Sequence, residues 1–547
     1  MSASNKKKLR KEQGAEKLTE KQLAAQKEAK TTRLYTIAFV AVLVVMIVIA
    51  IVVGVTQTIK NTGYYEKRTT AVQIGDHALS NAELNYYYID SINNFYSNYG
   101  SYAAMFGLDT TKPLDEQIVD EETGRTWADD FLDTAKESAK NVYALADAAE
   151  SAGFVLPGDK QEEIESSLSS IDLYAQVYGY KDGDAYLKAM YGSGASKEGY
   201  KAYATRSALA DAYYTYYSDS LTYTDDQIRE KDNEDLKVYS SYSYNSYYLS
   251  VSKFLTGGTT DENGNTTYSG EETAAAEAAV RAAADSLVAD EIDSTEALDA
   301  AIAALSINEG EENAASTDSN NIRYGSINSL YQQWVSDSSR KAGDKQVFES
   351  TTTDENGNES LSGCYVVFFE DSTDNQFSMA NVRHILVTPE HAADEAEDAH
   401  ADGETYSAEE LAAAKQEAEE LYAQWQSGEA TEESFAELAN EKSDDGDGTT
   451  GGLYTNVTPG QMVQAFNDWC FDASRKAGDT GIVQTEYGYH IMYFVGNSDI
   501  TYRDYLIQND LRSADVQQWQ EDMMAAVTMT DGDTKYIRTN LVLGSAG

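Results

Sequence analysis

Basic residues, histidine, cysteine and proline are all scarce in this chain. Its 547 residues include 41 Lys and Arg against 92 Asp and Glu, which gives a formal net charge of −51. Nucleic-acid binding depends on Lys and Arg that neutralise phosphates, so this charge argues against a nucleic-acid-binding protein. The two cysteines and five histidines exclude a disulfide scaffold, an iron–sulfur protein and the usual cysteine-rich zinc module. The four prolines exclude a proline-rich stalk.

Apolar and aromatic residues, in contrast, are plentiful. They make up 41% of the chain, and tyrosine alone contributes 40 residues. This composition permits a packed core and argues against global disorder. At about 100–200 residues per domain, the length predicts three or four domains.

One long apolar run predicts a membrane anchor. Residues 34–55 are 22 positions without a charge, and about 20 apolar residues cross a bilayer core. The 33 residues before the run hold ten basic and four acidic side chains, a net of +6, so the remainder carries −51 − 6 = −57. The positive-inside rule therefore predicts a cytoplasmic tail over 1–33, a single-pass signal anchor over 34–55, and an extracytoplasmic remainder at the cell membrane. A cleaved signal peptide would have a shorter apolar run of about 7–15 residues.

Residues 70–238 predict a mostly helical domain. After a short β-like stretch and a turn at Gly75–Asp76, Ser80 can cap a helix with Glu83 as its capping-box partner. His77 is expected in that turn, and further helices are expected over 127–152, 160–178 and 200–220. Many apolar positions are Tyr, which indicates either an amphipathic core and rim or an aromatic surface that holds non-native polypeptide.

An internal repeat decides the organisation of the second half. WVSDSSRKAGD begins at Trp334 and WCFDASRKAGD begins at Trp469, 135 residues later, with eight of eleven positions identical. The similarity continues in GCYVVFF from Gly363 and GYHIMYF from Gly488. Each copy also has an Ala/Glu-rich helix and a strand-like start. The pattern predicts two tandem α+β domains, 239–372 and 378–498, followed by a helical segment over 499–547 that we expect to pack on the 70–238 domain.

The second copy resembles the parvulin-type peptidyl-prolyl isomerases over residues 379–497. The motifs that carry the resemblance follow in order: NVRHILV, FAELANEKSDD, a Gly-Gly pair, GQMVQAF and GDTGIVQTEYGYHIMYF. The region from Val72 resembles the N-terminal chaperone part of SurA- and PrsA-like extracytoplasmic foldases. The resemblance implies an α+β multidomain fold with a helical SurA-N-like chaperone domain and two parvulin-like domains.

The resemblance also implies site residues. His384 and His490 match the two site histidines, Asp445 matches an Asp or Cys position, and Thr485 matches the threonine beside the histidines. We expect the two histidines to form a hydrogen-bonded pair that orients Thr485 and tunes Asp445. The substrate-binding residues that the resemblance implies are Met462, Phe466, Tyr487 and Leu453.

The second copy departs from the family motif at one point. The first copy lacks the site residues of the second. The family's GGDLG reads Gly-Gly-Leu-Tyr from Gly451, without the Asp. In the first copy we align Tyr248 with His384 and Tyr365 with His490. The remaining counterparts are Asn308 for Asp445, Ile327 for Met462 and Tyr331 for Phe466. The first copy is therefore predicted to be an inactive parvulin-like domain.

Cys364 and Cys470 occupy different positions in the two copies, so they are either buried thiols or an interdomain disulfide. His391 and His400 lie in an acidic stretch that we interpret as a solvated charged face rather than a metal site. We expect no cofactor and no metal.

The prediction is a membrane-anchored foldase that isomerises X–Pro bonds of unfolded or translocating polypeptides. The alternative is a non-catalytic holdase that uses its parvulin-like domains only for binding.

Overall fold

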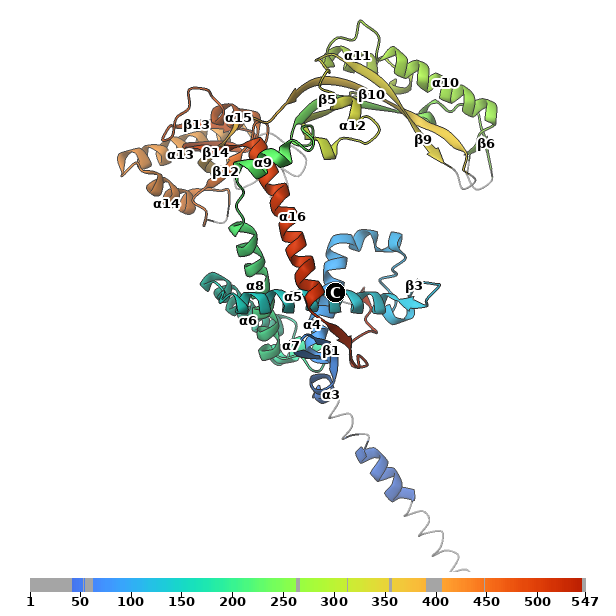
Figure 1. Cartoon of the computed structure of the whole chain (residues 1–547), viewed down its shortest axis with the longest axis vertical. Coiled ribbons are helices and arrows are strands. Elements are labelled where there is room, and N and C mark those ends of the chain that lie inside the picture. Colours follow the sequence, from blue (N-terminus) through green and yellow to red (C-terminus); the bar gives the residue numbers. More distant parts are fainter. Residues whose placement is uncertain are drawn as a thin grey trace, which may run out of the picture. The chain divides into compact units, whose positions relative to one another are not determined.

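The computed structural model describes residues 42–52, 54, 62–261, 266–311, 313–353, 357–389, 406–446 and 448–543 (Figure 1). Residues 34–41, 53 and 55 of the predicted anchor, the basic tail before it, and both His391 and His400 lie outside these residues. Residues 42–52 are helical with exposed side chains. Within the described part of the chain, no helix is both long enough and apolar enough to cross a membrane. The chain divides into two compact units, residues 1–221 with 515–547, and residues 222–514.

The first unit is mainly helical, as the sequence predicts. Ser80 caps its first long helix, and the expected capping box with Glu83 is present. Thr126 and Asp129 form a second capping box, which starts the 25-residue helix α5. The helices are α3 (Tyr64–Arg68), α4 (Asn81–Tyr99), α5 (Trp127–Ser151), α6 (Gly158–Val177), α7 (Gly183–Tyr191) and α8 (Lys197–Ser220).

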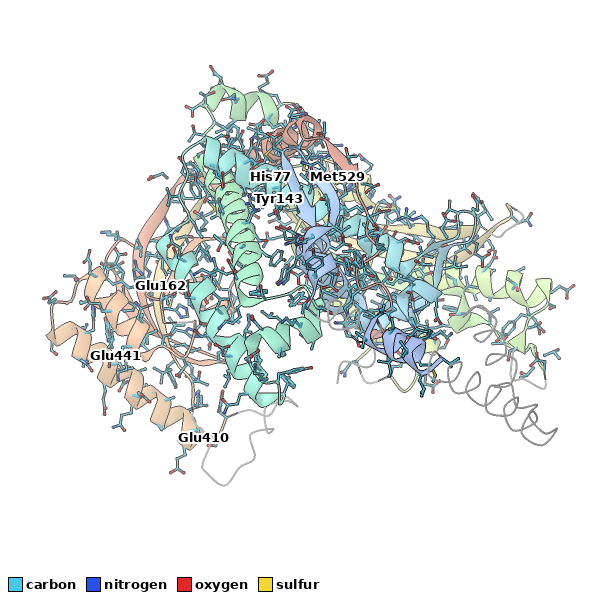
Figure 2. The ribbon with its side chains drawn as sticks, turned by 90° about the horizontal axis from the view of Figure 1, so that it is seen from below. His77, Tyr143, Glu162, Glu410, Glu441 and Met529 are labelled. Carbon is cyan, nitrogen blue, oxygen red and sulfur yellow. The ribbon has the colours of Figure 1, made fainter. Side chains whose placement is uncertain are left out.

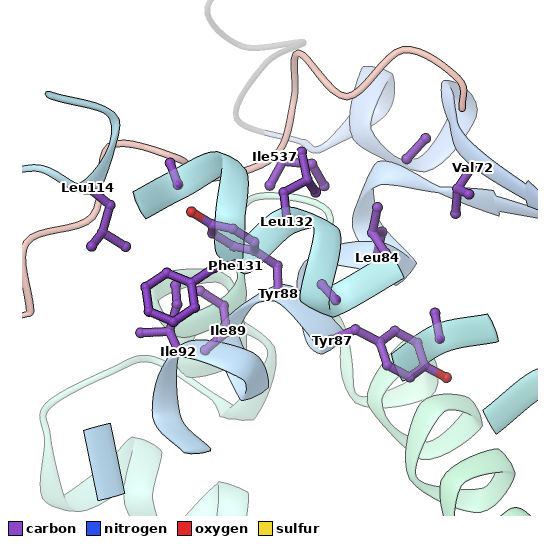
Figure 3. Close-up of a cluster of buried hydrophobic side chains, with 14 of the residues drawn as sticks. Val72, Leu84, Tyr87, Tyr88, Ile89, Ile92, Leu114, Phe131, Leu132 and Ile537 are labelled. Carbon is purple, nitrogen blue, oxygen red and sulfur yellow. The ribbon is translucent and has the colours of Figure 1, made fainter. Parts of the chain in front are cut away.

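A three-stranded antiparallel sheet joins the two ends of the first unit. The strands are β1 (Thr70–Ile74), β2 (His77–Ser80) and β15 (Met529–Asp531), in the order β15-β1-β2. The side chain of Asn81 extends the link, because its Nδ2 donates to the carbonyl of Asp533 at 2.8 Å. Ile537 lies in the same buried core as Leu84, Tyr88 and Phe131 (Figure 3). A short hairpin, β3 (Ile118–Asp120) with β4 (Arg125–Thr126), precedes α5.

The sequence predicts His77 in a turn. In the structure His77 directly follows the turn at Gly75–Asp76 and is the first residue of β2. Its Nε2 lies 2.9 Å from Oδ2 of Asp147, and its ring centroid is 4.9 Å from that of Tyr143 (Figure 2). The side chain therefore connects the sheet to α5, because Tyr143 and Asp147 are one helical turn apart.

The second unit contains two domains whose sheets have the same strand order. The first sheet is β8 (Thr317–Arg323), β5 (Ser241–Ser250), β10 (Glu359–Thr373) and β9 (Lys345–Thr353). The second sheet is β12 (Leu453–Val457), β11 (Ser378–Val387), β14 (Gly488–Thr501) and β13 (Thr480–Thr485). All neighbouring strands are antiparallel. The two tandem copies therefore share one architecture.

Helices accompany each sheet. The first domain has α10 (Gly270–Ser286), α11 (Thr295–Ala303), α12 (Gln332–Val335) and a hairpin of β6 (Thr259–Thr260) and β7 (Thr266–Thr267). The second domain has α13 (Ala408–Ser427), α14 (Glu432–Lys442) and α15 (Gln464–Cys470). Apolar side chains of α13 and α14 pack on one face of the second sheet, and Phe466 and Cys470 of α15 belong to the cluster on the other face.

The repeated SRKAGD segment has a structural reason. In each copy the arginine lies over the ring of the tryptophan that opens the segment, with Arg340 4.5 Å from the Trp334 centroid and Arg475 3.8 Å from that of Trp469. The glycine N–H then donates to the central strand of the sheet. These bonds are Gly343 to the Phe369 carbonyl at 2.9 Å and Gly478 to the Phe494 carbonyl at 2.8 Å. The repeat therefore preserves a turn before β9 in the first domain and before β13 in the second. These strands pair with β10 and β14, respectively.

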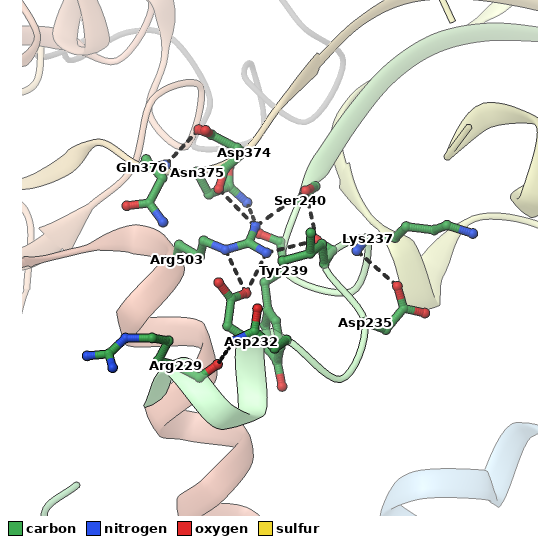
Figure 4. Close-up of polar contacts among 12 residues, drawn as sticks. Arg229, Asp232, Asp235, Lys237, Tyr239, Ser240, Asp374, Asn375, Gln376 and Arg503 are labelled. Carbon is green, nitrogen blue, oxygen red and sulfur yellow. Dashed lines mark hydrogen bonds and ion pairs between the residues drawn. The ribbon is translucent and has the colours of Figure 1, made fainter. Parts of the chain in front are cut away.

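A buried arginine joins three connecting segments of the second unit (Figure 4). Arg503 is only 3% exposed and lies at the start of α16 (Tyr502–Ala526). Its guanidinium donates to Oδ1 of Asp232 at 2.8 Å, to the Leu236 carbonyl at 2.9 Å and to the Asp374 carbonyl at 3.1 Å. Asp232 ends α9 (Asp225–Asp232). The contacts therefore join the chain segments that precede the first domain, link it to the second, and follow the second.

Candidate active site

The two central strands of the second domain carry one histidine each. His384 of β11 is opposite Met492 of β14, and His490 of β14 is opposite Leu386 of β11. Residues two apart on a strand point to the same side of a sheet, so both imidazoles lie on the face that carries Phe466. The opposite face, with Ile385 and Ile491, packs against α13 and α14.

The four polar residues that the resemblance implies lie together in one hydrogen-bonded chain. The Nδ1 atoms of His384 and His490 are 3.1 Å apart. Nε2 of His384 lies 3.0 Å from Oδ2 of Asp445, and Nε2 of His490 lies 2.8 Å from Oγ1 of Thr485. The two histidines are only 2% and 5% exposed, whereas Asp445 is partly exposed. The chain therefore runs from a buried floor to an accessible carboxylate.

An ionised Asp445 fixes the direction of every proton in this chain. A carboxylate only accepts, so Nε2 of His384 carries the hydrogen and its Nδ1 is the acceptor. His490 must then donate from Nδ1 and accept at Nε2 from the hydroxyl of Thr485. The Thr485 oxygen in turn accepts from the backbone N–H of Tyr487 at 3.2 Å. One neutral tautomer of each histidine satisfies all of these contacts.

Burial keeps both imidazoles neutral. Desolvation, aided by the neighbouring His384 and opposed by Asp445, lowers the pKa of His490 to about 4. Desolvation also lowers the pKa of His384, against the attraction of Asp445. At neutral pH the pair is therefore a set of hydrogen-bonding dipoles rather than a charged acid.

Apolar and aromatic side chains cover the histidines. Phe466 is buried and meets both imidazoles edge to face, with ring centroids 5.4 Å apart in each case. Met462 is half-buried and packs on the same cluster. These two expected wall residues are therefore placed beside the histidine pair.

The other two expected substrate-binding residues are placed differently. Tyr487 lies in the turn between β13 and β14 and is 56% exposed. Leu453 is half-buried at the start of β12 and, among the described residues, is outside both apolar clusters of the domain. The structure brings neither side chain into recorded contact with the histidines.

Tyr454 is a site residue that the sequence reasoning missed. Its hydroxyl donates to Oδ2 of Asp445 at 2.6 Å, and its ring centroid is 4.8 Å from that of His384. Burial and the carboxylate together raise its pKa to about 12, so the hydroxyl keeps its proton. Its placement depends on the β11–β12 register, in which Tyr454 pairs with Val382, and the sequence does not give that register.

The Gly-Gly pair makes this register possible. Gly452 has a φ of +64°, and a Cβ there would collide with the carbonyl oxygen of His384. The carbonyl of Gly452 instead accepts the backbone N–H of His384 at 2.9 Å. The glycines therefore allow β12 to approach β11, the strand of His384, closely.

The strand register corrects the alignment of the first domain. In the second domain His384 is opposite Met492, and the Met492 counterpart Val367 is opposite Ser246. Ser246, not Tyr248, therefore occupies the position of His384. The sequence alignment failed because NSYYLSV and NVRHILV match by letter two positions away from their structural equivalence.

The rest of the first-domain site is aromatic. Tyr365 stands where His490 stands in the second domain, and its ring centroid lies 5.6 Å from that of Tyr331, the counterpart of Phe466. Asn308, aligned with Asp445, is buried and donates to the Ile302 carbonyl at 2.8 Å. The histidine–carboxylate chain of the second domain thus has no counterpart among these residues.

Cys364 and Cys470 are free and buried. Burial raises the pKa of both thiols, that of Cys470 to about 12. Across the described ranges, no group of three or more His, Cys, Asp or Glu side chains is arranged to hold a metal ion.

Comparisons with known proteins identify the family of the second domain. Residues 384–496 match the family model described as a rotamase, the PPIC-type PPIase domain, which confirms the parvulin resemblance. No curated protein matches the chain.

Three solved structures with some similarity are PrsA peptidyl-prolyl isomerases. The Bacillus cereus protein is 23% identical, with 28% of this chain and 49% of that chain covered and a TM-score of 0.17. The Bacillus anthracis protein is 20% identical, with 28% of this chain and 59% of that chain covered and a TM-score of 0.17. PrsA from Bacillus subtilis is 23% identical, with 27% of this chain and 49% of that chain covered and a TM-score of 0.18. The matched region spans about half of each of these chains.

Proposed function

We propose that this chain, which carries a parvulin-type peptidyl-prolyl isomerase domain at residues 384–496, is an extracytoplasmic foldase that isomerises X–Pro bonds. The observation that carries the proposal is the buried neutral pair of His384 and His490, bonded to Asp445 and covered by Phe466. The reaction is rotation about a partial double bond with a barrier of about 18–20 kcal/mol. Neither a cofactor nor a covalent bond to substrate is needed.

The residues act on the planar amide by electrostatics and shape. Resonance in the planar amide places negative charge on the carbonyl oxygen, and twisting the bond removes this resonance. A carboxylate beside that oxygen disfavours the planar form and so favours the twisted one, which is differential transition-state binding. Asp445 is held for this role by His384 at 3.0 Å and by Tyr454 at 2.6 Å.

The apolar wall holds the proline ring. Phe466 and Met462 offer a contact surface without hydrogen-bonding groups, next to the histidines. Desolvating the carbonyl against this wall weakens the resonance that water supports. Thr485, fixed by His490 and by the Tyr487 N–H, keeps the orientation of the imidazole.

We extend the proposal to the rest of the chain. The uncharged segment 34–55 would anchor the protein in the membrane, with the acidic remainder outside. The helical unit would act as a SurA-N-like chaperone part, and the first parvulin-like domain would be inactive. The clients would be unfolded or translocating chains with X–Pro bonds, whose slow isomerisation takes tens to hundreds of seconds.

Isomerisation of a short proline peptide by the full chain in detergent micelles tests the proposal. We expect the wild-type chain to accelerate the reaction, and Met462→Ala and His384→Ala to reduce kcat/KM at least tenfold. His77→Ala is the matched control, because His77 lies in the other unit and should leave the rate unchanged. An inactive wild-type chain that still prevents client aggregation would instead favour the non-catalytic holdase. Unchanged rates in both site variants would contradict the proposed site.

A further inference from the structure

The first unit contains a hollow of about 940 Å³ that the isomerase site does not use. Side chains of α4, α5 and α8, together with Gln520, line it. Its volume is at the upper end of ordinary ligand sites of about 300–1,000 Å³. Several side chains of an extended polypeptide would fit. We call it the aromatic hollow after its aromatic residues Tyr87, Phe95, Tyr99, Trp127, Phe131, Tyr203 and Tyr214.

Ring contacts connect the aromatic hollow with exposed apolar side chains. The Phe95 ring centroid is 5.4 Å from those of Trp127 and Tyr99, and 6.0 Å from that of Phe106. Phe106 and its neighbour Met105 are exposed. A contiguous exposed apolar surface marks an interaction site. The indole N–H of buried Trp127, which lines the hollow, has no partner in the described part of the chain.

The charge of the hollow has one sign. Asp90, Asp130 and Asp211 line it, and none of its lining residues is Lys or Arg. The hydroxyl of Tyr203 donates to Asp90, and burial raises the pKa of this carboxyl. Two guanidiniums lie close to the lining. Arg125 is 3.3 Å from Asp130 but 2.8 Å from Asp133, and Arg206 lies 4.3 Å from the centroid of the Tyr143 ring, where its charge also acts on the lining residue Tyr87. Arg125 is thus shared with Asp133, and the side chains that line the hollow include three carboxylates and no cation.

We infer that the aromatic hollow binds non-native polypeptide segments in which Lys or Arg lies beside an apolar or aromatic residue. The rings bury the apolar side chain, and the cation relieves the repulsion among the three carboxylates while lying against ring faces. Acidic segments are repelled by the same carboxylates. The inference rests on the proposed foldase function, since it names the class of client that the helical unit selects.

Binding of three labelled peptides to the full chain in detergent micelles tests the inference. The peptides contain no proline and share one aromatic and apolar sequence, with Lys, Ser or Glu at the same two positions. We expect the Lys peptide to bind best and the Glu peptide worst, with the difference shrinking at high salt. Asp211→Asn should lower the affinity for the Lys peptide about two- to fivefold, which is the size of one exposed charge pair. It should not lower the affinity for the Glu peptide.

Two matched controls isolate the hollow. Asp219 is exposed on the same helix as Asp211 but does not line the hollow, so Asp219→Asn should change nothing. Tyr99→Ser should weaken all three peptides, whereas Tyr96→Ser should not, because both tyrosines are 47% exposed and only Tyr99 lines the hollow.

Equal binding of the Lys and Glu peptides, equal effects of the two Asp variants, or no binding by any peptide would overturn the inference. Proline-peptide isomerisation reports the other unit and would remain intact in each of these cases. A failure here is therefore distinguishable from a failure of the proposed isomerase.

Discussion

Arg503 and Asp232, 271 residues apart in the sequence, form an ion pair in which the arginine side chain is almost fully buried. The pair joins the helix that precedes the first α+β domain of the second unit to the helix that follows the second. Because the chain passes this point on entering, linking and leaving the two domains, the contact helps to define how these segments are held within the second unit.

Replacing Arg503 by alanine should destabilise the second unit. Removing one partner of a buried pair leaves the other charge and several carbonyls without their donor. We expect a loss of about 2–3 kcal/mol in the free energy of unfolding, below the usual 3–5 because the Asp232 side chain keeps 22% of its exposure. Denaturant unfolding measures the loss. Arg229→Ala, which removes an exposed pair with Asp226, should cost less than about 0.5 kcal/mol, and an equal cost would contradict the expectation.

The stability of the second domain should fall with decreasing pH because of its histidines. The pKa of His490 is about 4 in the folded domain, below its ordinary value of 6.5. Between these two pH values the unfolded chain therefore binds a proton at His490 and the folded domain does not. Stability from this residue is complete above pH 6.5 and declines by about 1.4 kcal/mol per pH unit between 6.5 and 4. The lowered pKa of His384 acts in the same direction.

Hydrogen exchange of the β11 and β14 amides reports this domain and can measure the slope. Wild type should lose stability more steeply between pH 6.5 and 5 than His490→Gln, because the carboxylates titrate alike in both. Parallel slopes in the two proteins would mean that His490 is protonated in the folded domain.

Tyr454→Phe should lower isomerase activity without unfolding the domain. The change removes the 2.6 Å hydrogen bond to Asp445 and leaves the ring beside His384. A hydrogen bond to a partly exposed charged group is worth about 1 kcal/mol, so kcat/KM should fall about fivefold. Tyr487→Phe provides the comparison, since that ring is exposed and its side chain has no recorded contact with the site. A larger effect at Tyr487 would move the substrate contact to the β13–β14 turn.

The first domain should not contribute to catalysis. Tyr365→Leu should leave the isomerisation rate of the full chain unchanged, whereas His490→Leu at the equivalent strand position should reduce it at least tenfold. The comparison uses the same proline peptide and the same detergent conditions. A loss of activity in Tyr365→Leu would show that the two domains act on the substrate together.

The sequence predicts much of the fold because its signals there are local. The Ser80–Glu83 capping box and the helices near 127–152 and 160–178 follow from capping and periodicity, and the structure has them at these places. The repeat around Trp334 and Trp469 predicts a second copy of the same domain, and the two sheets do share one strand order. In each case neighbouring residues decide the outcome.

Signals that depend on register are harder to find in the sequence. The Ser246 equivalence and the Tyr454 contact both depend on which residues face each other across strands, and a shift of two positions leaves the inward pattern unchanged. The family motif alone implies Tyr487 and Leu453, and the motif does not show that Tyr487 lies in an exposed turn or that Leu453 lies outside both apolar clusters. The aromatic hollow combines α4, α5 and α8 with a residue from near the C-terminus, so no single stretch of sequence reveals it.

The pairing of β15 with β1 has a consequence for the order of maturation. The sheet of the first unit cannot be completed until residues 529–531 are available, and the core that it covers includes Ile537. Chains generally fold domain by domain as they are made, N-terminal parts first. During synthesis this chain would reverse that order, because the inserted residues 222–514 emerge whole while the helical unit still lacks its final strand. The unit whose sequence comes first would therefore be the last part of the chain to close.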